Sequence, residues 1–204
     1  MLDEKRYLFG GLEEKLGDFF NRWPISPNQW TLISLAAGLV SVYLVIIQSF
    51  IWAVFLFLIA AFADFINGII ARRRDNYTRA FRYFDTMADR YVDGLILFGM
   101  LFLPLPVIYL PGYVWLFLIL FGSLVTAFAK AAAKEKEMVI VELKGGIVTR
   151  AERIILISLA LLLATIDTTF VWTTYVLIFL AVITNFTAFQ RIDSAVKADK
   201  KSRA

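Results

Sequence analysis

Acidic residues between positions 64 and 93 have the residue types and spacing most suited to chemistry. Asp64 lies at the end of one apolar stretch, and Asp85, Asp89 and Asp93 open another. The last three recur every four residues, so on a helix they share one face. Ionisable groups inside apolar segments are costly and are functional candidates by default. Because acids packed together repel one another, the pattern predicts one or two divalent cations between them.

The chain has no cysteine and no histidine. It therefore lacks thiolate and imidazole metal ligands, as well as the usual proton shuttle. Oxygen ligands alone favour a hard cation, so Mg²⁺ is expected, with Mn²⁺ as the alternative. Acid–base chemistry must then come from Asp, Glu, Lys or Tyr.

Small and basic residues accompany Asp64 on its helix face. Gly68 and Ala71 leave a shallow groove, and Arg72 lies beside it as a fork for phosphate oxygens. A cation, an arginine and a groove together predict a site for a diphosphate. No glycine-rich phosphate loop of the P-loop or Rossmann kind is present.

Simpler interpretations apply to single members of this set. A lone acid in an apolar helix is often only a hydrogen-bonding partner, and Asp93 could pair with Arg90 or with a neighbouring helix. The other arginines nearby favour a role in topology and lipid-headgroup contact. They are Arg73, Arg74, Arg79 and Arg82.

Long apolar segments must position these residues. Hydrophobic residues make up 60% of the 204 and charged residues only 19%, a composition typical of membrane proteins. A helix needs roughly 20 apolar residues to cross the hydrocarbon core. Six segments qualify, covering about residues 30–48, 51–70, 84–103, 113–133, 147–165 and 170–189. The sequence therefore predicts an all-α polytopic membrane protein with six transmembrane helices.

The two ends of the chain differ from this core. Apolar residues at three- and four-residue spacing predict an amphipathic helix within residues 1–25 that lies in the membrane interface. They are Leu12, Leu16, Phe19, Phe20 and Trp23. The expected organisation is this juxtamembrane helix, a catalytic domain over 26–192, and a charged cytoplasmic tail over 193–204.

Basic residues are distributed unevenly among the predicted turns. All 21 Lys and Arg fall at the two ends, around the second-to-third turn, or between the fourth and fifth spans. The positive-inside rule then places both termini and the acid cluster at the cytoplasmic face of a cell membrane. The net charge of +4 follows from this topology, and no nucleic-acid partner is expected.

The stretch from Asp64 to Asp89 resembles the signature of the CDP-alcohol phosphatidyltransferases. That signature reads D-x-x-D-G-x-x-A-R, eight residues, then G-x-x-x-D-x-x-x-D, and the spacing here is the same. The matching residues are Asp64, Gly68, Ala71, Arg72, Asp85 and Asp89. Asn67 replaces the second aspartate of the signature, and Phe81 replaces its second glycine.

The resemblance implies a mechanism and a site. It implies two metal ions held by Asp64, Asn67, Asp85 and Asp89, with a CDP-linked lipid bound at Gly68, Ala71 and Arg72. Asp89 would act as general base on the acceptor hydroxyl, and CMP would leave. Thr31 resembles part of the family's opening segment and is a candidate nucleotide contact, although an interfacial helix start predicts the same residue types. Relatives of this kind are dimers, so a homodimer is expected.

Four cations beyond the signature bear on the acceptor. They are Lys130, Arg150, Arg153 and Arg191. Residues 149–153 and 189–192 are similar to stretches in the inositol-phosphate-using branch of the family. Cations around a second pocket suit an acceptor that carries its own phosphate, and glycerol 3-phosphate satisfies this argument as well as inositol 1-phosphate does. The resemblance to the inositol-phosphate-using branch favours inositol 1-phosphate. The alternative is that each is a positive-inside residue at a helix end.

Three other functions compete with this one. The chain could be a catalytically impaired relative that still binds CDP-lipid, because Asn67 removes a charge and Phe81 adds bulk. It could be a glycerol-3-phosphate-using synthase. A small cation transporter is disfavoured, because the acids lie towards one face and no internal repeat is visible.

Overall fold

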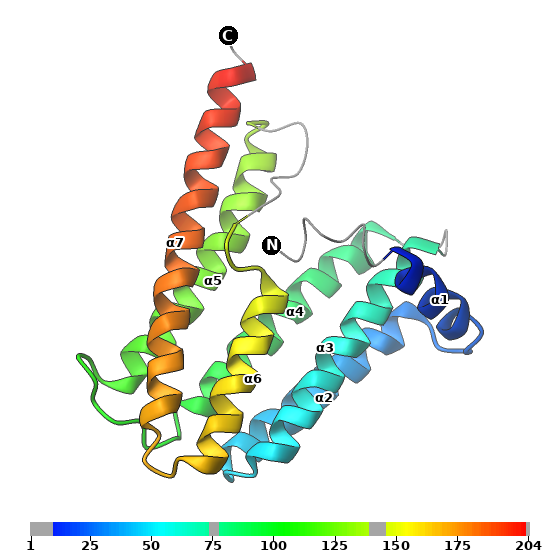
Figure 1. Ribbon diagram of the computed structural model, residues 1–204. Coiled ribbons are helices and arrows are strands. Elements are labelled where there is room, and N and C mark those ends of the chain that lie inside the picture. Colours follow the sequence, from blue (N-terminus) through cyan, green and yellow to red (C-terminus); the bar gives the residue numbers. More distant parts are fainter. Residues whose placement is uncertain (1–9, 74–77, 139–145, 203–204) are drawn as a thin grey trace. The chain divides into compact units, whose positions relative to one another are not determined.

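The structure is a computed structural model that describes residues 10–73, 78–138 and 146–202 (Figure 1). In these ranges all regular structure is α-helical, which confirms the predicted fold class. The helices are α1 (Gly10–Asn21), α2 (Pro27–Ile46), α3 (Phe50–Arg73), α4 (Arg79–Met100), α5 (Gly112–Glu135), α6 (Arg150–Ile166) and α7 (Val171–Ser202).

Four of these helices are long and apolar enough to cross a membrane: α2, α3, α5 and α7. Helix α4 contains the row of acids together with arginines, and α6 has 17 residues. The six-span count therefore stays a prediction for α4 and α6. Helix α1 lies within the segment predicted to be amphipathic, and its position at the membrane interface stays a prediction too.

The chain divides into two compact units. The N-terminal unit lies within Arg6–Pro104 and Ala164–Ile166, and the C-terminal unit consists mainly of Leu105–Leu163 and Asp167–Ala204. In the N-terminal unit α2 packs against both α3 and α4, and α1 packs against α3. In the C-terminal unit α5 packs against α7.

Local sequence explains how α2 begins and how it is joined to α3. The Ser26 hydroxyl accepts a hydrogen bond from the Gln29 N–H, and the Gln29 side chain accepts one from the Ser26 N–H, which is a capping box. Along the helix, the buried hydroxyls of Ser34 and Ser41 donate to the carbonyl oxygens of Ala60 and Ala53 at 2.8 and 2.7 Å. Small hydroxylated residues thus let the two helices approach closely while their polar groups are satisfied.

Glycines set the contact between α2 and α4. A Cβ atom on Gly38 would lie 3.2 Å from the Val92 methyl carbons. A Cβ atom on Gly99 would lie 3.1 Å from Val42 Cγ1 and 3.3 Å from the Val42 carbonyl oxygen. The backbone of α4 therefore lies directly against α2 near Gly99, which fixes where the acidic row of α4 stands relative to α2.

The C-terminal unit is joined by side chains that donate to backbone carbonyls. Asn185 Nδ2 on α7 donates to the Leu118 carbonyl of α5 at 2.9 Å. The same side chain lies against Gly122 of α5, where a Cβ atom would be 3.0 Å from Asn185 Cγ. Thr173 Oγ1 on α7 donates to the Ala160 carbonyl of α6 at 3.0 Å. Helix α7 continues beyond its predicted span, and residues 193–202, expected as a tail, extend it by further turns.

Asp167 connects α6 to α7. Its carboxylate accepts hydrogen bonds from the Thr169 hydroxyl and, at 3.0 Å each, from the backbone N–H groups of Thr169 and Trp172. The Thr169 hydroxyl, followed by the Trp172 N–H, lowers the pKa of Asp167 below its ordinary value, because both donate to the charged form. The carboxylate thus satisfies N–H groups at the start of α7 that have no partner within the helix.

We expect Gly99→Val to destabilise the N-terminal unit, because valine would overlap both the side chain and the backbone of Val42. Overpacking of this kind costs about 1–3 kcal/mol. Thermal unfolding of the purified protein in detergent measures the effect. The matched control is Gly11→Val on α1, where a Cβ atom meets nothing within 4 Å. An equal loss of stability in both variants would contradict the close contact.

Candidate active site

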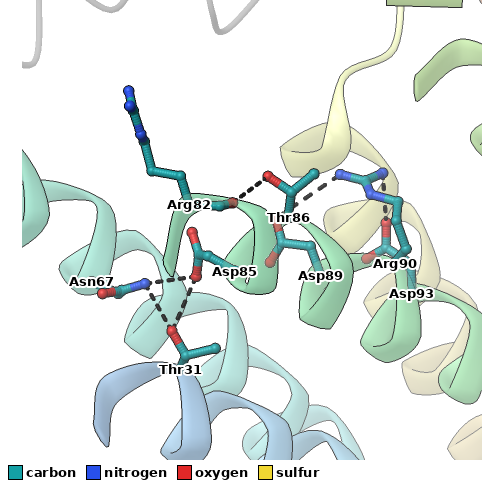
Figure 2. Close-up of polar contacts among 8 residues, drawn as sticks. All are labelled: Thr31, Asn67, Arg82, Asp85, Thr86, Asp89, Arg90 and Asp93. Atoms are coloured by element: carbon teal, nitrogen blue, oxygen red, sulfur yellow. Dashed lines mark hydrogen bonds and ion pairs between the residues drawn. The ribbon is translucent and has the colours of Figure 1, made fainter. Parts of the chain in front are cut away.

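Three side chains from three helices meet at the centre of the predicted site. Asn67 Nδ2 on α3 lies 2.7 Å from Asp85 Oδ1 on α4 and 3.0 Å from Thr31 Oγ1 on α2. The Thr31 hydroxyl in turn lies 3.1 Å from the same Asp85 oxygen. Figure 2 shows the resulting triangle of hydrogen bonds. Two donors from neighbouring helices thus hold one carboxylate oxygen.

Burial makes these contacts necessary. Asn67 is 0% exposed and Thr31 is 3% exposed, so neither polar group is compensated by water. An unpaired buried amide or hydroxyl costs about 1–3 kcal/mol. The structure therefore brings together Asn67 and Asp85, two of the predicted metal ligands, and places Thr31 beside them.

Asp89 and Asp93 continue the acidic row along α4. Arg90 Nη1 lies 3.7 Å from Asp93 Oδ2, and Arg90 Nη2 lies 3.9 Å from Asp89 Oδ2 (Figure 2). Of the two alternatives left open for Asp93, Arg90 or a neighbouring helix, the structure shows a pair with Arg90, and Asp93 is 8% exposed. Asp89 lies one helical turn after Asp85 on α4, and Arg90 is the next residue in the chain.

Oxygen atoms dominate the groups that could hold a cation here. Asp64 lies one turn before Asn67 on α3, and Asp89 lies one turn after Asp85 on α4. Across residues 10–73, 78–138 and 146–202, no three carboxylates gather closely enough to hold an ion by themselves. Asn67 Oδ1, however, is buried and accepts no hydrogen bond in the described structure. An unused buried oxygen among carboxylates fits a ligand of a hard cation.

The signature arginine has a partner that sequence reasoning missed. Arg72 Nη2 lies 3.2 Å from Glu13 Oε2 on α1. Arg72 also extends over Gly68, because its Nη1 would lie 3.7 Å from a Cβ atom placed there. Glu13 lies one residue from the apolar position Leu12 in a segment predicted as helical, but nothing in its local spacing indicates a partner 59 residues away.

Phe81, the second departure from the signature, is 8% exposed. It lies in the first turn of α4, where its backbone N–H donates to the Thr78 side chain at 3.2 Å and so caps the helix. The phenyl ring is therefore packed into the protein.

The cations predicted for the acceptor lie within the C-terminal unit. Arg191 Nη1 on α7 donates to the Thr126 carbonyl of α5 at 3.4 Å, and Lys130 lies one turn beyond Thr126. The segment before α6 reaches the same part of α7, since the Val148 N–H donates to Thr187 Oγ1 at 3.2 Å. Arg150 and Arg153 follow in the first turns of α6, and Arg153 is 5% exposed. Lys130 and Arg191 are thus carried by the contacting helices α5 and α7, and Arg150 and Arg153 follow a segment that contacts α7.

The family model described as CDP-alcohol phosphatidyltransferase matches residues 24–186, which include the whole acidic row. The chain belongs to this family. The resemblance carried by residues 64–89 is therefore confirmed. Family membership and the apolar helices together make this chain a multi-pass membrane protein of a lipid phosphotransferase family.

Individual relatives agree with this assignment. The archaetidylinositol phosphate synthase of Pyrococcus horikoshii is 32% identical over 156 residues, which cover 72% of this chain and 74% of that protein. The fold is similar to that of the Mycobacterium tuberculosis phosphatidylinositol phosphate synthase with CDP-DAG bound. The TM-score is 0.74 at 20% identity, covering 91% of this chain and 94% of the other. A second structure of that protein, in complex with manganese and citrate, gives a TM-score of 0.73 at 20% identity, covering 90% and 88%.

We expect Asn67→Asp to make folding stability depend on divalent cations. A carboxylate at this position would replace a donor 2.7 Å from Asp85 with a second negative charge. The free energy of unfolding should fall by about 1–3 kcal/mol in chelator and should recover when Mg²⁺ or Mn²⁺ is added. Thermal unfolding with and without the cation measures this difference.

Asn67→Leu is the control for this experiment. It also removes the hydrogen bonds but adds no charge, so its stability should respond to the cation no more than that of the unchanged chain. Equal stabilisation of both variants by the cation would contradict a cation position next to residue 67.

Proposed function

We propose that this protein transfers the phosphatidyl-type group of a CDP-linked lipid to a hydroxyl of a small phosphorylated polyol and releases CMP. Inositol 1-phosphate is the favoured acceptor. The observation that carries the proposal is the triangle of Thr31, Asn67 and Asp85, which joins the two halves of the family signature at one buried point. It brings the acids of α4 next to the groove residues of α3.

The lipid diphosphate would bind along the end of α3. Gly68 leaves room on the helix surface, and the Arg72 guanidinium lies over it where it can donate to phosphate oxygens. Ala71, the other predicted groove residue, is buried beside it at 3% exposure. Thr31 of α2 contacts Asn67, the residue before Gly68, at 3.0 Å. A related synthase of this fold has been crystallised with CDP-DAG, which supports a CDP-lipid as the donor.

A divalent cation would be held by Asp64, Asn67, Asp85 and Asp89. When bound, Mg²⁺ or Mn²⁺ would neutralise diphosphate charge and improve CMP as a leaving group. Two ions are the expectation from the family signature, and the related synthase in complex with manganese supports a metal of this kind. The unused Asn67 Oδ1 provides a neutral ligand where the signature has a charged one.

Asp89 is the proposed general base. It would take the proton of the acceptor hydroxyl while the hydroxyl oxygen forms a bond to the lipid-linked phosphorus. The bond from that phosphorus to the CMP oxygen breaks in the same transfer, so the products are a phosphodiester lipid and CMP. Asp85 is held by hydrogen bonds to Asn67 and Thr31, and Asp93 is engaged by Arg90. Asp89 is proposed as the base because it stands at the last aspartate of the family signature, and Arg90 Nη2 lies 3.9 Å from its Oδ2.

The acceptor phosphate would be bound by cations of the C-terminal unit: Lys130, Arg150, Arg153 and Arg191. A buried arginine such as Arg153 suits a bidentate phosphate contact better than a role at the membrane surface. The similarity to an archaetidylinositol phosphate synthase favours inositol 1-phosphate. Both termini and the site would face the cytoplasm, and the protein would act as a homodimer.

We expect purified protein in detergent to release CMP from CDP-diacylglycerol or CDP-archaeol when Mg²⁺ and inositol 1-phosphate are present. Asp89→Asn should lower the rate at least about a hundredfold, because it removes the base. The matched control is Asp193→Asn, the same change at an exposed acid of α7 that pairs only with Lys197 among the contacts described. Release should stop on chelation.

Other outcomes would replace parts of the proposal. Release with glycerol 3-phosphate and not with inositol 1-phosphate would change the acceptor. No release with any acceptor, but release by the Asn67→Asp protein, would identify a relative that binds CDP-lipid and has lost turnover. That alternative is retained because the Asn67 amide donates to Asp85, a contact that an aspartate could not make in its charged form.

A further inference from the structure

Helix α1 packs on α3, the helix that carries Gly68 and Arg72. Leu16 and Phe20 pack against a buried cluster that contains Trp30 of α2 and Ile66 and Ile70 of α3. The Phe20 ring meets the Trp30 ring edge-on, with centroids 5.5 Å apart. Apolar packing of this kind fixes α1 beside the end of α3, where the basic residues 72 and 73 lie.

Arg73 of α3 binds the polar face of α1. Its Nη2 donates to the Glu14 carbonyl at 2.9 Å, and its Nη1 pairs with Asp18. The guanidinium lies where a side chain on Gly17 would project, since a Cβ atom there would be 2.5 Å from Arg73 Cζ. The missing side chain at Gly17 therefore lets Arg73 lie flat on α1 and sets the rotation of α1 against α3.

This arrangement presents Glu13 to Arg72. Glu13 Oε2 binds Nη2 of the Arg72 guanidinium, while Nη1 of the same group lies over Gly68. The Glu13 side chain is 20% exposed and that of Arg72 is 50% exposed, so the acid is the more enclosed partner. A guanidinium has five donors in a planar fork, and one contact to Glu13 leaves others directed towards the groove.

We propose that Glu13 is a positioning residue for the lipid donor: it holds Arg72 in the orientation that meets the diphosphate of CDP-lipid. This inference rests on the proposed function, because it assigns Glu13 a role in the same site. Holding a long side chain in one rotamer before binding removes part of the entropy cost of binding. Helix α1 would thereby contribute to donor affinity without contacting the donor.

The test is equilibrium binding of CDP-diacylglycerol by Glu13→Gln, together with steady-state kinetics. Glutamine keeps the size of the side chain and removes the charge. The dissociation constant and the KM for CDP-diacylglycerol should rise about three- to fivefold, the range of a partly exposed ion pair. The turnover number and the KM for the acceptor should change less than about twofold, because Glu13 does not act on the chemical step.

Glu14→Gln is the matched control. Glu14 is the adjacent residue of α1, its side chain is exposed, and only its backbone carbonyl contacts Arg73. This variant should bind and turn over CDP-diacylglycerol as the unchanged chain does. A second comparison uses Arg72→Gln, in which adding Glu13→Gln should weaken binding no further, because the positioned group is gone.

The outcomes separate this inference from the proposed function. If the unchanged chain binds neither CDP-diacylglycerol nor CDP-archaeol, the proposed function itself is overturned; if it binds only CDP-archaeol, the same comparison of variants is made with that donor. If it binds and Glu13→Gln matches Glu14→Gln, the positioning role is overturned and the function stands. A fall in turnover number with a lower melting temperature, and no selective change in donor KM, would assign Glu13 a purely structural role and would also overturn the inference.

Discussion

A buried amide at the junction of three helices constrains much of the N-terminal unit. Asn67 has no exposed surface, so its amide hydrogens require acceptors inside the protein. Thr31 of α2 and Asp85 of α4 supply them, which requires all three helices to stand in one register. The hydroxyls of Ser34 and Ser41 and the close approach at Gly99 maintain that register along α2. Packing of the unit and geometry of the site therefore depend on the same contacts.

Charges near the site are arranged in local pairs. Asp93 is engaged by Arg90 on its own helix, and the basic end of α3 is engaged by the acids of α1. At partly exposed positions such ion pairs contribute at most about 1 kcal/mol to stability, but they restrict the orientation of long side chains. Arg90 also lies 3.9 Å from Asp89, and Asp85 accepts hydrogen bonds from Asn67 and Thr31. The three acids of α4 thus differ in their polar partners, although they recur at the same spacing.

The two departures from the family signature are both accommodated by the structure. At position 67 an amide can donate to Asp85, whereas a carboxylate would need a cation between them. At position 81 the phenylalanine is buried in the first turn of α4. Asn67 is therefore consistent with a folded site in which one oxygen, Asn67 Oδ1, remains available as a ligand.

Local pattern was sufficient to predict the helices and the row of acids. Long apolar runs predicted α2, α3 and α5. The four-residue spacing of Asp85, Asp89 and Asp93 placed them on one face, because helix periodicity is a local property. The boundaries were less well predicted: α4 begins at Arg79, before the predicted span, and α7 continues to Ser202. Polar residues can extend a helix that an apolar window ends too early.

Residue types and short-range spacing were enough to indicate the family, the helical class and the candidate acids. The partner of each polar group depends instead on how the helices pack. The contacts of Asn67 with Thr31, and of Glu13 with Arg72, join residues 36 and 59 positions apart. Such pairs form because packing brings distant helices together and burial then requires their polar groups to be satisfied, and no local pattern records that requirement.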